Sequence, residues 1–202
     1  MKRLNKAAVT CAVLAVLILI SCILISNGYE YFMKRAYPLA YTDIVAKEAT
    51  ENHLDPAFVY SVIKTESNFK SDALSRAGAV GLMQITPDTF EWLQTKLKSD
   101  TEYTTQDLFR PEINIRYGCK FLSLLLEKYD KRETALCAYN AGMGTVNSWL
   151  KDTKISSDGE TIERIPYQET RSYVGSVLNN YQNYSKLYQF NSKGEEIDGK
   201  KK

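Results

Sequence analysis

The residue of this sequence best placed for acid–base chemistry is Glu66. It follows Val59, Val62 and Ile63 by seven, four and three positions, spacings that put it on the apolar face of a helix. A carboxyl group on such a face is costly to ionise, so its pKa rises and it keeps its proton closer to neutral pH. A general acid needs that property. The alternative is a partly exposed glutamate at a helix end, paired with Lys70 four positions later.

Other side chains offer less for catalysis. Asp72, Asp88 and Glu91 are available as a second carboxylate, but Asp88 and Glu91 suit the first turns of a helix and Asp72 suits a solvated loop. His53 is the only histidine and there is no Cys-x-x-Cys pair, so a zinc site or a Ser-His-Asp triad would have to include His53. It precedes a turn and has no serine or cysteine elbow near it. We expect a surface histidine, no metal and no cofactor.

The composition is that of an ordinary globular protein. Of 202 residues, 44% are hydrophobic and 25% are charged, which argues against a disordered chain, a collagen-like chain and a multi-span membrane protein. A formal charge of +2 is too small to indicate nucleic-acid binding. The length favours one domain, and we expect a monomer with no nucleic-acid partner.

The N-terminal segment predicts a membrane-spanning helix. Residues 7–25 form an apolar run of 19 residues, interrupted only by Thr10 and Ser21, which is long enough to cross the hydrocarbon core as a helix. Basic residues flank both ends of the run, so the positive-inside rule favours a cytoplasmic N-terminus only modestly. We expect a single-pass protein of the cell membrane whose remaining residues face the extracytoplasmic side.

Two other interpretations of this segment stay open. A cleaved signal peptide usually has a shorter apolar region of about 7–15 residues, and residues 26–28 match a cleavage site poorly. Residues 19–22 resemble the lipobox of bacterial lipoproteins, in which Cys22 would be lipidated, but the apolar run continues through Ile25. We therefore favour an uncleaved anchor.

Two cysteines lie beyond this anchor. Cys119 and Cys137 both sit in apolar, helix-like stretches. A disulfide in an oxidising compartment and two small buried hydrophobic residues are both open, and the surroundings favour the second.

Apolar periodicity and capping residues predict a mostly helical chain. Asp55 suits an N-cap with Pro56 at the first helical position, and Thr86 with Pro87 repeats the pattern. Asp158-Gly159 predicts a weak hairpin, and hence a small β element. The expected helices lie at residues 41–52, 56–68, from 87, 111–129, 134–139, 145–150 and 170–187. The expected domain limits are 1–29 for the membrane segment, 30–40 for a linker, 41–188 for the folded domain and 189–202 for a disordered polar tail.

Four motifs stand in order along the folded part. They are ESNF at 66–69, SRAGAVGLMQITP at 75–87, AYNAG at 138–142 and IPYQETRSYV at 165–174. Together they resemble the motifs of the soluble lytic transglycosylase (SLT) catalytic domain, over about residues 40–188. That family belongs to the lysozyme-like superfamily and is similar in fold to goose-type lysozyme. The resemblance implies a mainly α, lysozyme-like domain with a small β element.

The resemblance also implies an activity. Family members cleave the β-1,4 bond between N-acetylmuramic acid (MurNAc) and N-acetylglucosamine (GlcNAc) in peptidoglycan without water, because the muramic C6 hydroxyl attacks its own C1 and leaves a 1,6-anhydro end. Glu66 matches the single catalytic glutamate, which acts first as acid and then as base. An internal nucleophile removes the need for the second carboxylate that other glycosidases use.

Substrate-binding residues follow from the same resemblance: Ser75, Met83, Gln84, Tyr139, Asn140 and Tyr173. The serine matches one near the reacting sugar, and the Met-Gln pair matches a groove segment beside the glutamate. The Tyr-Asn pair matches residues that bind the acetamido sugar, and the last tyrosine matches one whose hydroxyl approaches the glutamate. Phe121 stands where family members frequently carry tyrosine, so a hydroxyl near the site is expected to be absent.

The expected partners are peptidoglycan glycan strands and, through the N-terminal helix, the membrane. The nearest alternative function is a hydrolase of goose-lysozyme type, which would use water in place of the C6 hydroxyl. A second alternative is an inactive wall-binding scaffold. Such a scaffold would be expected to have replaced its glutamate, whereas Glu66 is present.

Overall fold

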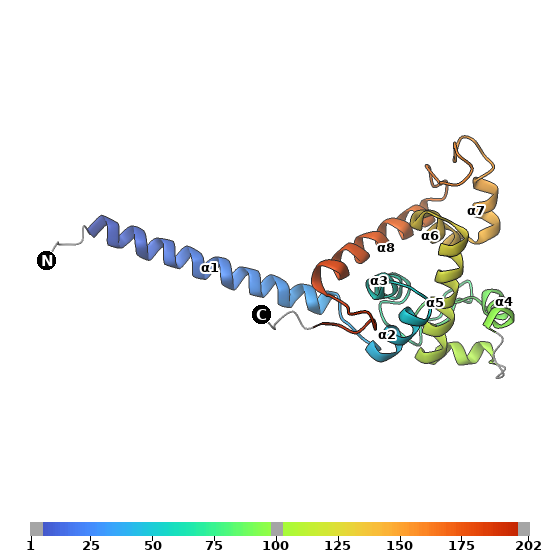
Figure 1. Cartoon of the computed structure of the whole chain (residues 1–202), viewed down its shortest axis with the longest axis horizontal. Helices are drawn as coiled ribbons and strands as arrows, with labels where there is room; N and C mark the ends of the chain where they lie inside the picture. Colours follow the sequence, from blue (N-terminus) through green and yellow to red (C-terminus); the bar gives the residue numbers. More distant parts are fainter. Residues whose placement is uncertain (1–5, 98–102, 198–202) are drawn as a thin grey trace. The chain divides into compact units, whose positions relative to one another are not determined.

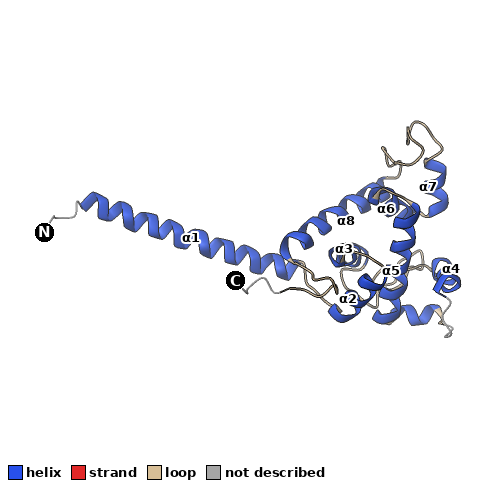
Figure 2. Ribbon diagram, viewed as in Figure 1, coloured by secondary structure: helices blue, strands red, loops and turns tan. Residues whose placement is uncertain are grey.

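The computed structural model describes residues 6–97 and 103–197 and divides into two compact units. The first unit is Met1–Pro38 and the second is Leu39–Lys202. Helices and loops make up both units in the described ranges (Figures 1 and 2). The second unit contains all four sequence motifs, so the site must be built from its helices and loops.

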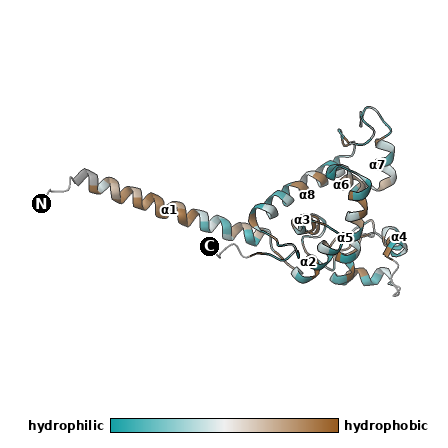
Figure 3. Cartoon of the chain, viewed as in Figure 1, coloured by the Kyte–Doolittle hydropathy of each residue, from teal (hydrophilic) through white to brown (hydrophobic). Residues whose placement is uncertain are grey.

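One long helix dominates the first unit. α1 runs over Lys6–Ala36, and its Val9–Ala36 part is long and apolar enough to cross a membrane. Figure 3 shows this apolar stretch in brown, followed by more polar residues toward the end of the helix. Residues 30–36 were expected to be linker and are helical instead. Lys34 Nζ lies 3.2 Å from the Glu30 carboxylate one turn earlier, a pairing that favours continuation of the helix.

The second unit is mostly helical, as the sequence predicts. Asp55 caps its helix as expected, since its carboxylate accepts a hydrogen bond of 2.9 Å from the N–H of Ala57. The helices are α2 (Thr42–Glu51), α3 (Pro56–Glu66), α4 (Pro87–Leu97), the 3₁₀ helix η1 (Thr105–Phe109), α5 (Pro111–Lys128), α6 (Arg132–Ala141), α7 (Met143–Trp149) and α8 (Gln168–Leu187). Part of the loop expected between α4 and α5 lies outside the described residues.

Helix α3 is the centre of the core. Its residues from Ala57 to Ile63 are all buried, and α8 and α2 both pack on it. Figure 1 shows α3 surrounded by α8, α6, α5 and α2. The Arg132 guanidinium, at the start of α6, lies 4.9 Å from the Phe58 ring of α3 and 4.5 Å from the Tyr181 ring of α8. These contacts tie three helices together and fix the position of α3.

The small β element was predicted incorrectly. Within the described residues there is no sheet, only isolated bridges, which pair Leu74 with Val80, Val80 with Ile85 and Phe190 with Glu196. At the expected hairpin, the Asp158 carboxylate accepts hydrogen bonds from the N–H groups of residues 160 and 161. The side chain therefore helps to hold a turn, as aspartate often does, together with a main-chain hydrogen bond of 3.0 Å from Glu163 to Ile155, and no strand forms there.

The C-terminal segment was expected to be disordered, but residues 189–197 form a turn. The Ile197 N–H donates to the Gln189 carbonyl at 2.7 Å, and the Asn191 N–H donates to the Glu195 carbonyl at 2.9 Å. Gly194 contacts the backbone of α2 near Ala46. Backbone pairing and this close approach order a sequence whose polar composition predicted no structure.

A buried amide holds the loop between α3 and α4. The Asn114 side chain, on α5, has no exposed surface. Its Nδ2 donates to the carbonyls of Val80 and Leu108, both at 2.8 Å, and its Oδ1 accepts from the N–H of Met83 at 2.7 Å. Gly81 lies against the same amide with a φ of +77°, so a Cβ atom there would contact Asn114 and come within 2.5 Å of the Leu108 carbonyl oxygen.

Replacing Gly81 with alanine should therefore destabilise the fold. A positive φ and a Cβ collision both oppose the side chain, and together they should cost about 2–4 kcal/mol in the free energy of unfolding. The same substitution at exposed Gly175 in α8, where nothing lies within 4 Å, should instead stabilise by about 0.5–1 kcal/mol. Urea denaturation of both variants tests this, and equal effects at the two glycines would contradict it.

Candidate active site

Glu66 is the last residue of α3 and is only partly buried. The preceding turns of the helix lie in the core, and the carboxyl group emerges at the helix end. Desolvation by burial raises its pKa to about 7 from an ordinary value of 4.5, and the hydroxyl of Tyr173 acts in the opposite direction. A carboxylate at the C-terminus of a helix is also disfavoured by the helix dipole. The site thus contains a carboxyl group that exchanges its proton near neutral pH.

Tyr173 brings a hydroxyl from α8 to this carboxyl group. The Tyr173 side chain is buried, and its hydroxyl makes no hydrogen bond of ordinary geometry within the described part of the chain. Burial raises its pKa, and so does the nearby Glu66 carboxylate. The structure therefore places the two groups close together, although the Tyr173 hydroxyl makes no hydrogen bond of ordinary length and angle. A buried hydroxyl without a hydrogen-bond partner is uncommon in folded proteins.

The loops that follow Glu66 carry a strained backbone. Asn68, Phe69 and Gln84 have φ values of +50°, +67° and +49°, in a region that side chains other than glycine rarely adopt. The Ser67 hydroxyl joins the two loops by donating to the carbonyl of Leu82 at 2.8 Å. Strained residues persist only where the surrounding structure holds them, and such residues cluster at functional sites.

Three predicted residues lie in the loop that Asn114 holds. The Ser75 hydroxyl accepts a hydrogen bond of 2.9 Å from the N–H of Ala79 and is partly exposed. The Gln84 amide donates to the Gly81 carbonyl at 2.9 Å and is also partly exposed. Met83 has no exposed surface, so the structure puts its side chain in the core. Its carbonyl, not its side chain, faces the neighbouring predicted residue Tyr139.

Tyr139 and Asn140 come from the end of α6. The Tyr139 hydroxyl donates to the Met83 carbonyl at 2.7 Å, and burial together with the charge of Glu66 raises the pKa of Tyr139. The Asn140 side chain is partly exposed, and its amide makes no hydrogen bond within the described residues. Asn140 therefore offers both a donor and an acceptor to a ligand.

A row of aromatic rings connects four helices beside Glu66. The ring of Tyr139 lies 6.4 Å from that of Tyr173 with 6° between their planes, and 5.0 Å from that of Phe121. The Trp92 ring of α4 continues the row, 6.1 Å from Phe121. Phe121 fills a place in this row with a ring that has no hydroxyl, as expected from the sequence. Partly exposed Trp92 was not singled out by the sequence.

Sequence reasoning also missed Asn114, which positions the loop that carries Ser75 and Gln84. A usable pattern was present, because an amide between Ile113 and Ile115 near the start of an apolar helix is an uncommon choice.

The three residues that the sequence offered as a second carboxylate are all exposed: Asp72, Asp88 and Glu91. Within the described residues, no carboxylate affects the pKa of Glu66.

Candidate metal ligands and thiols are few in the described ranges. No group of three His, Cys, Asp or Glu side chains that could hold a metal ion occurs among residues 6–97 and 103–197. Cys119 and Cys137 are buried and are not joined by a disulfide. Burial raises the pKa of both thiols, so they remain protonated and unreactive at neutral pH.

Comparison with known proteins agrees with this geometry. The chain is similar to the soluble lytic murein transglycosylase of Salmonella typhimurium, with 33% identity over 149 residues, which cover 72% of this chain and 23% of that protein. It is 28% identical over 204 residues to the membrane-bound lytic murein transglycosylase C of Yersinia pestis, covering 89% of this chain and 56% of the relative.

Solved structures give the same picture. An inactive mutant of the lytic transglycosylase Slt from Pseudomonas aeruginosa superposes with a TM-score of 0.66 at 34% identity, over 81% of this chain and 27% of that one. The chain thus spans about a quarter of the length of the soluble relatives it matches. The family described as "Transglycosylase SLT domain" matches residues 43–162, which include Glu66 and most of the site around it. The chain therefore belongs to the transglycosylase SLT domain family.

Proposed function

We propose that this protein is a membrane-anchored lytic transglycosylase that cleaves the β-1,4 bond between MurNAc and GlcNAc in peptidoglycan without water. The observation that carries the proposal is the partly buried Glu66 carboxyl, whose pKa burial raises to about 7. Such a group is present in both protonation states near neutral pH, which suits a residue that acts as acid and then as base. Relatives named as lytic murein transglycosylases support the same reaction.

The reaction needs one proton carrier. Protonated Glu66 gives its proton to the glycosidic oxygen as the bond from that oxygen to muramic C1 breaks. The carboxylate then takes the proton of the muramic C6 hydroxyl while O6 bonds to C1, which closes the 1,6-anhydro ring and returns Glu66 to its starting state. No water is consumed. The lack of a second carboxylate acting on Glu66 within the described residues fits this scheme.

The neighbouring residues then have distinct roles. The Tyr173 hydroxyl stabilises the ionised carboxyl between the two proton transfers, since it lowers the pKa of Glu66. The free amide of Asn140 binds the acetamido group of a sugar, and Ser75 and Gln84 bind polar groups of the glycan from the opposite loop. Met83 acts through its main chain, because its carbonyl positions Tyr139.

The cellular setting completes the proposal. α1 anchors the protein by a single pass, and the unit that follows it acts on the extracytoplasmic side, where peptidoglycan lies. A relative named as membrane-bound and the apolar length of Val9–Ala36 support this arrangement.

The first test replaces Glu66 with glutamine. The amide keeps the shape of the side chain but carries no transferable proton, so turnover of murein should fall by about 10²–10⁴-fold while glycan binding persists. Mass spectrometry of the wild-type digest should show products with anhydro ends, each lighter by one water than a reducing end. Reducing ends in place of these would indicate the hydrolase, and substantial activity of the variant would identify another acid.

The pH profile tests the role of Tyr173. Because protonated Glu66 is the active form, kcat/KM for murein should fall as the pH rises through about 7. The Tyr173 hydroxyl lowers the pKa of Glu66, so in Tyr173→Phe this fall should move to higher pH. Tyr167→Phe, an exposed tyrosine at the start of α8, serves as control and should leave the profile unchanged. An unshifted profile in Tyr173→Phe would refute this role.

The raised pKa also predicts how stability depends on pH. Between about pH 4.5 and 7 the folded protein binds more protons at Glu66 than the unfolded chain, so this group lowers stability as the pH rises. Glu66→Gln removes the effect and should raise the free energy of unfolding by about 1–3 kcal/mol at pH 8, with a much smaller gain at pH 4. Glu91→Gln, at an exposed site, should show no such pH dependence in the same denaturation experiment.

A further inference from the structure

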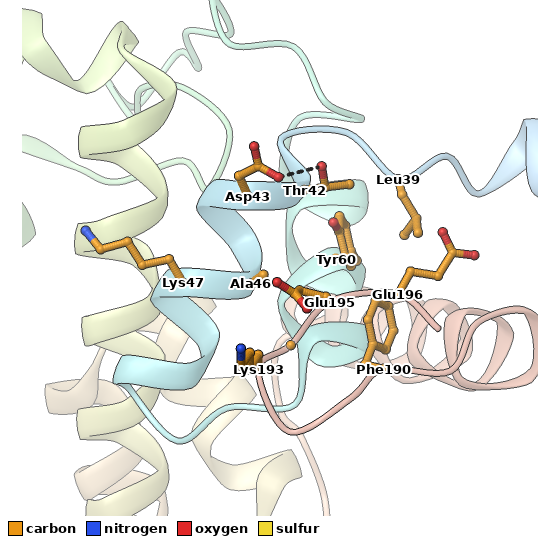
Figure 4. Close-up of a pocket in the computed structure, with 11 residues that line it drawn as sticks. Leu39, Thr42, Asp43, Ala46, Lys47, Tyr60, Phe190, Lys193, Glu195 and Glu196 are labelled. Carbon is orange, nitrogen blue, oxygen red and sulfur yellow. Dashed lines mark hydrogen bonds between the residues drawn. The ribbon is translucent and has the colours of Figure 1, made fainter. Parts of the chain in front are cut away.

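A concave site lies away from Glu66 in the same unit. A cavity of about 540 Å³ opens between α2, Tyr60 of α3 and the turn at residues 190–196 (Figure 4). This volume is within the range of small-molecule binding sites. Neither Glu66 nor any of the predicted substrate-binding residues lines it. The cavity is therefore distinct from the site described above.

The C-terminal turn builds one wall of this cavity. Phe190 and Glu196 form an antiparallel bridge that closes the turn. Gly194, at its tip, has a φ of +75°, and a Cβ atom there would lie 2.9 Å from the carbonyl oxygen of Ala46. Only glycine allows the turn to approach α2 this closely, so the local sequence is adapted to form the wall.

An unpaired hydroxyl stands at the floor. Tyr60 is only 2% exposed, its ring stacks on Phe190 at 6.0 Å and 22°, and its hydroxyl reaches into the cavity (Figure 4). Residues 6–97 and 103–197 contain no hydrogen-bond partner for that hydroxyl. A phenol that is buried apart from its tip and lacks a partner is a donor and acceptor available to a ligand.

The charge around this floor is mainly negative. Asp43, Glu195 and Glu196 line the cavity, against Lys193 on the same turn. Burial raises the pKa of Tyr60, and the carboxylates of Glu196 and Asp43 raise it further, so both lie near its hydroxyl. Carboxylates around an aromatic floor attract a cation that also has apolar surface.

The other lysine of the lining does not neutralise this charge. Lys47 lies at the edge of the cavity and extends away from its centre (Figure 4). Its ammonium group lies 3.4 Å from the carboxylate of Glu48 and 3.9 Å from that of Glu51. Since the described residues hold no cluster of His, Cys, Asp and Glu suited to a metal, an organic cation fits the cavity better than a metal ion.

We infer that this cavity binds the ammonium-bearing side chain of a peptide. The identity of this peptide rests on the proposed function: it is the stem peptide of peptidoglycan. The diamino-acid residue of that peptide combines an aliphatic chain with a free ammonium. The ammonium lies among Asp43, Glu196 and the Tyr60 hydroxyl, the aliphatic chain lies on the Tyr60 and Phe190 rings, and Lys193 faces the peptide carboxylates at the mouth.

This site gives the enzyme a preference among strands. A cross-link converts the amine of the acceptor stem peptide into an amide, so an acceptor stem loses the charge that the cavity recognises, whereas an uncross-linked stem keeps it. Helix α3 carries both Tyr60 and Glu66, and the Tyr60 ring lies 6.3 Å from that of Phe69, three residues beyond Glu66. Peptide binding and glycan cleavage thus share one rigid element.

Calorimetric titration of the full chain in detergent micelles tests the inference. The probe is a soluble tetrapeptide, Ala-isoglutamate-Lys-Ala, with a free lysine amine, and the matched probe is the same peptide acetylated at that amine. The free peptide should bind at least tenfold more tightly than the acetylated one. The double variant Asp43→Asn, Glu196→Gln should bind the free peptide at least tenfold more weakly, and Tyr60→Phe should also weaken it.

Controls separate this site from the active site. Glu91→Gln removes an exposed carboxylate of α4 that neither lines the cavity nor contacts Lys47, and it should leave peptide affinity unchanged. Glu66→Gln should abolish lysis yet retain full peptide binding. If the wild-type protein lacks lytic activity but discriminates between the two peptides, the proposed function fails and the peptide site stands.

Three results would overturn the inference. One is equal affinity of the wild-type protein for the free and acetylated peptides, which does not depend on any variant folding. Another is loss of peptide binding in Glu66→Gln with retention in the Asp43, Glu196 double variant, which would place the peptide in the catalytic groove. The third is displacement of the peptide by phosphoethanolamine at concentrations at which lysine amide has no effect, which would assign the cavity to a lipid headgroup.

Discussion

The site depends on the burial of one carboxyl group at the end of a core helix. Because α3 is buried from Ala57 to Ile63, its last residue emerges at a fixed place and with little freedom to turn toward water. Desolvation is the largest influence on the pKa of Glu66, and it comes from the packing of the domain, since no charged group among residues 6–97 and 103–197 shifts this pKa. A domain with a looser α3 would hydrate the carboxyl and lose the acid, whatever other residues surrounded it.

The loops around Glu66, unlike the regular helix α3, have a strained backbone. Asn68, Phe69 and Gln84 hold positive φ values that an isolated loop would not keep, so their geometry must be imposed from outside. For Gln84, Asn114 supplies much of that constraint through its three hydrogen bonds to the segment before Gln84 and to η1, and the Ser67 hydroxyl links the loop of Asn68 and Phe69 to the same segment. The bonds of Asn114 are to main-chain groups, which explains how one buried polar side chain can position several functional ones.

Sequence reasoning predicted the helices well because their determinants are local. The Asp55-Pro56 start and the apolar face of α3 needed only spacing and capping rules. It failed where the local pattern was not decisive. Hydrogen bonds to the Asp158 carboxylate and between residues 155 and 163 close a turn in place of a hairpin, and residues 189–197 are ordered by backbone pairing and by contact with α2. Glu66 could be assigned a role from its position. The pattern around Asn114 could mark it as unusual but could not give its role, because Val80 and Met83, which its amide binds, lie 34 and 31 positions away in the sequence. The predicted substrate contacts and domain limits remain predictions.

A glycosidic cleavage that uses an internal nucleophile requires only one carboxyl group in a suitable environment. Two-carboxylate glycosidases must hold two acidic groups at a set distance with different pKa values, which requires two distinct environments. A single carboxyl that cycles between acid and base requires one environment in which both forms are accessible, and a pKa near 7 satisfies that condition. One buried helix, a clamped loop and a tyrosine from α8 are sufficient to create it. Under the proposed function, the remaining surface of the domain is free for recognising the polymer, and the cavity beside Tyr60 lies on the same helix that carries Glu66.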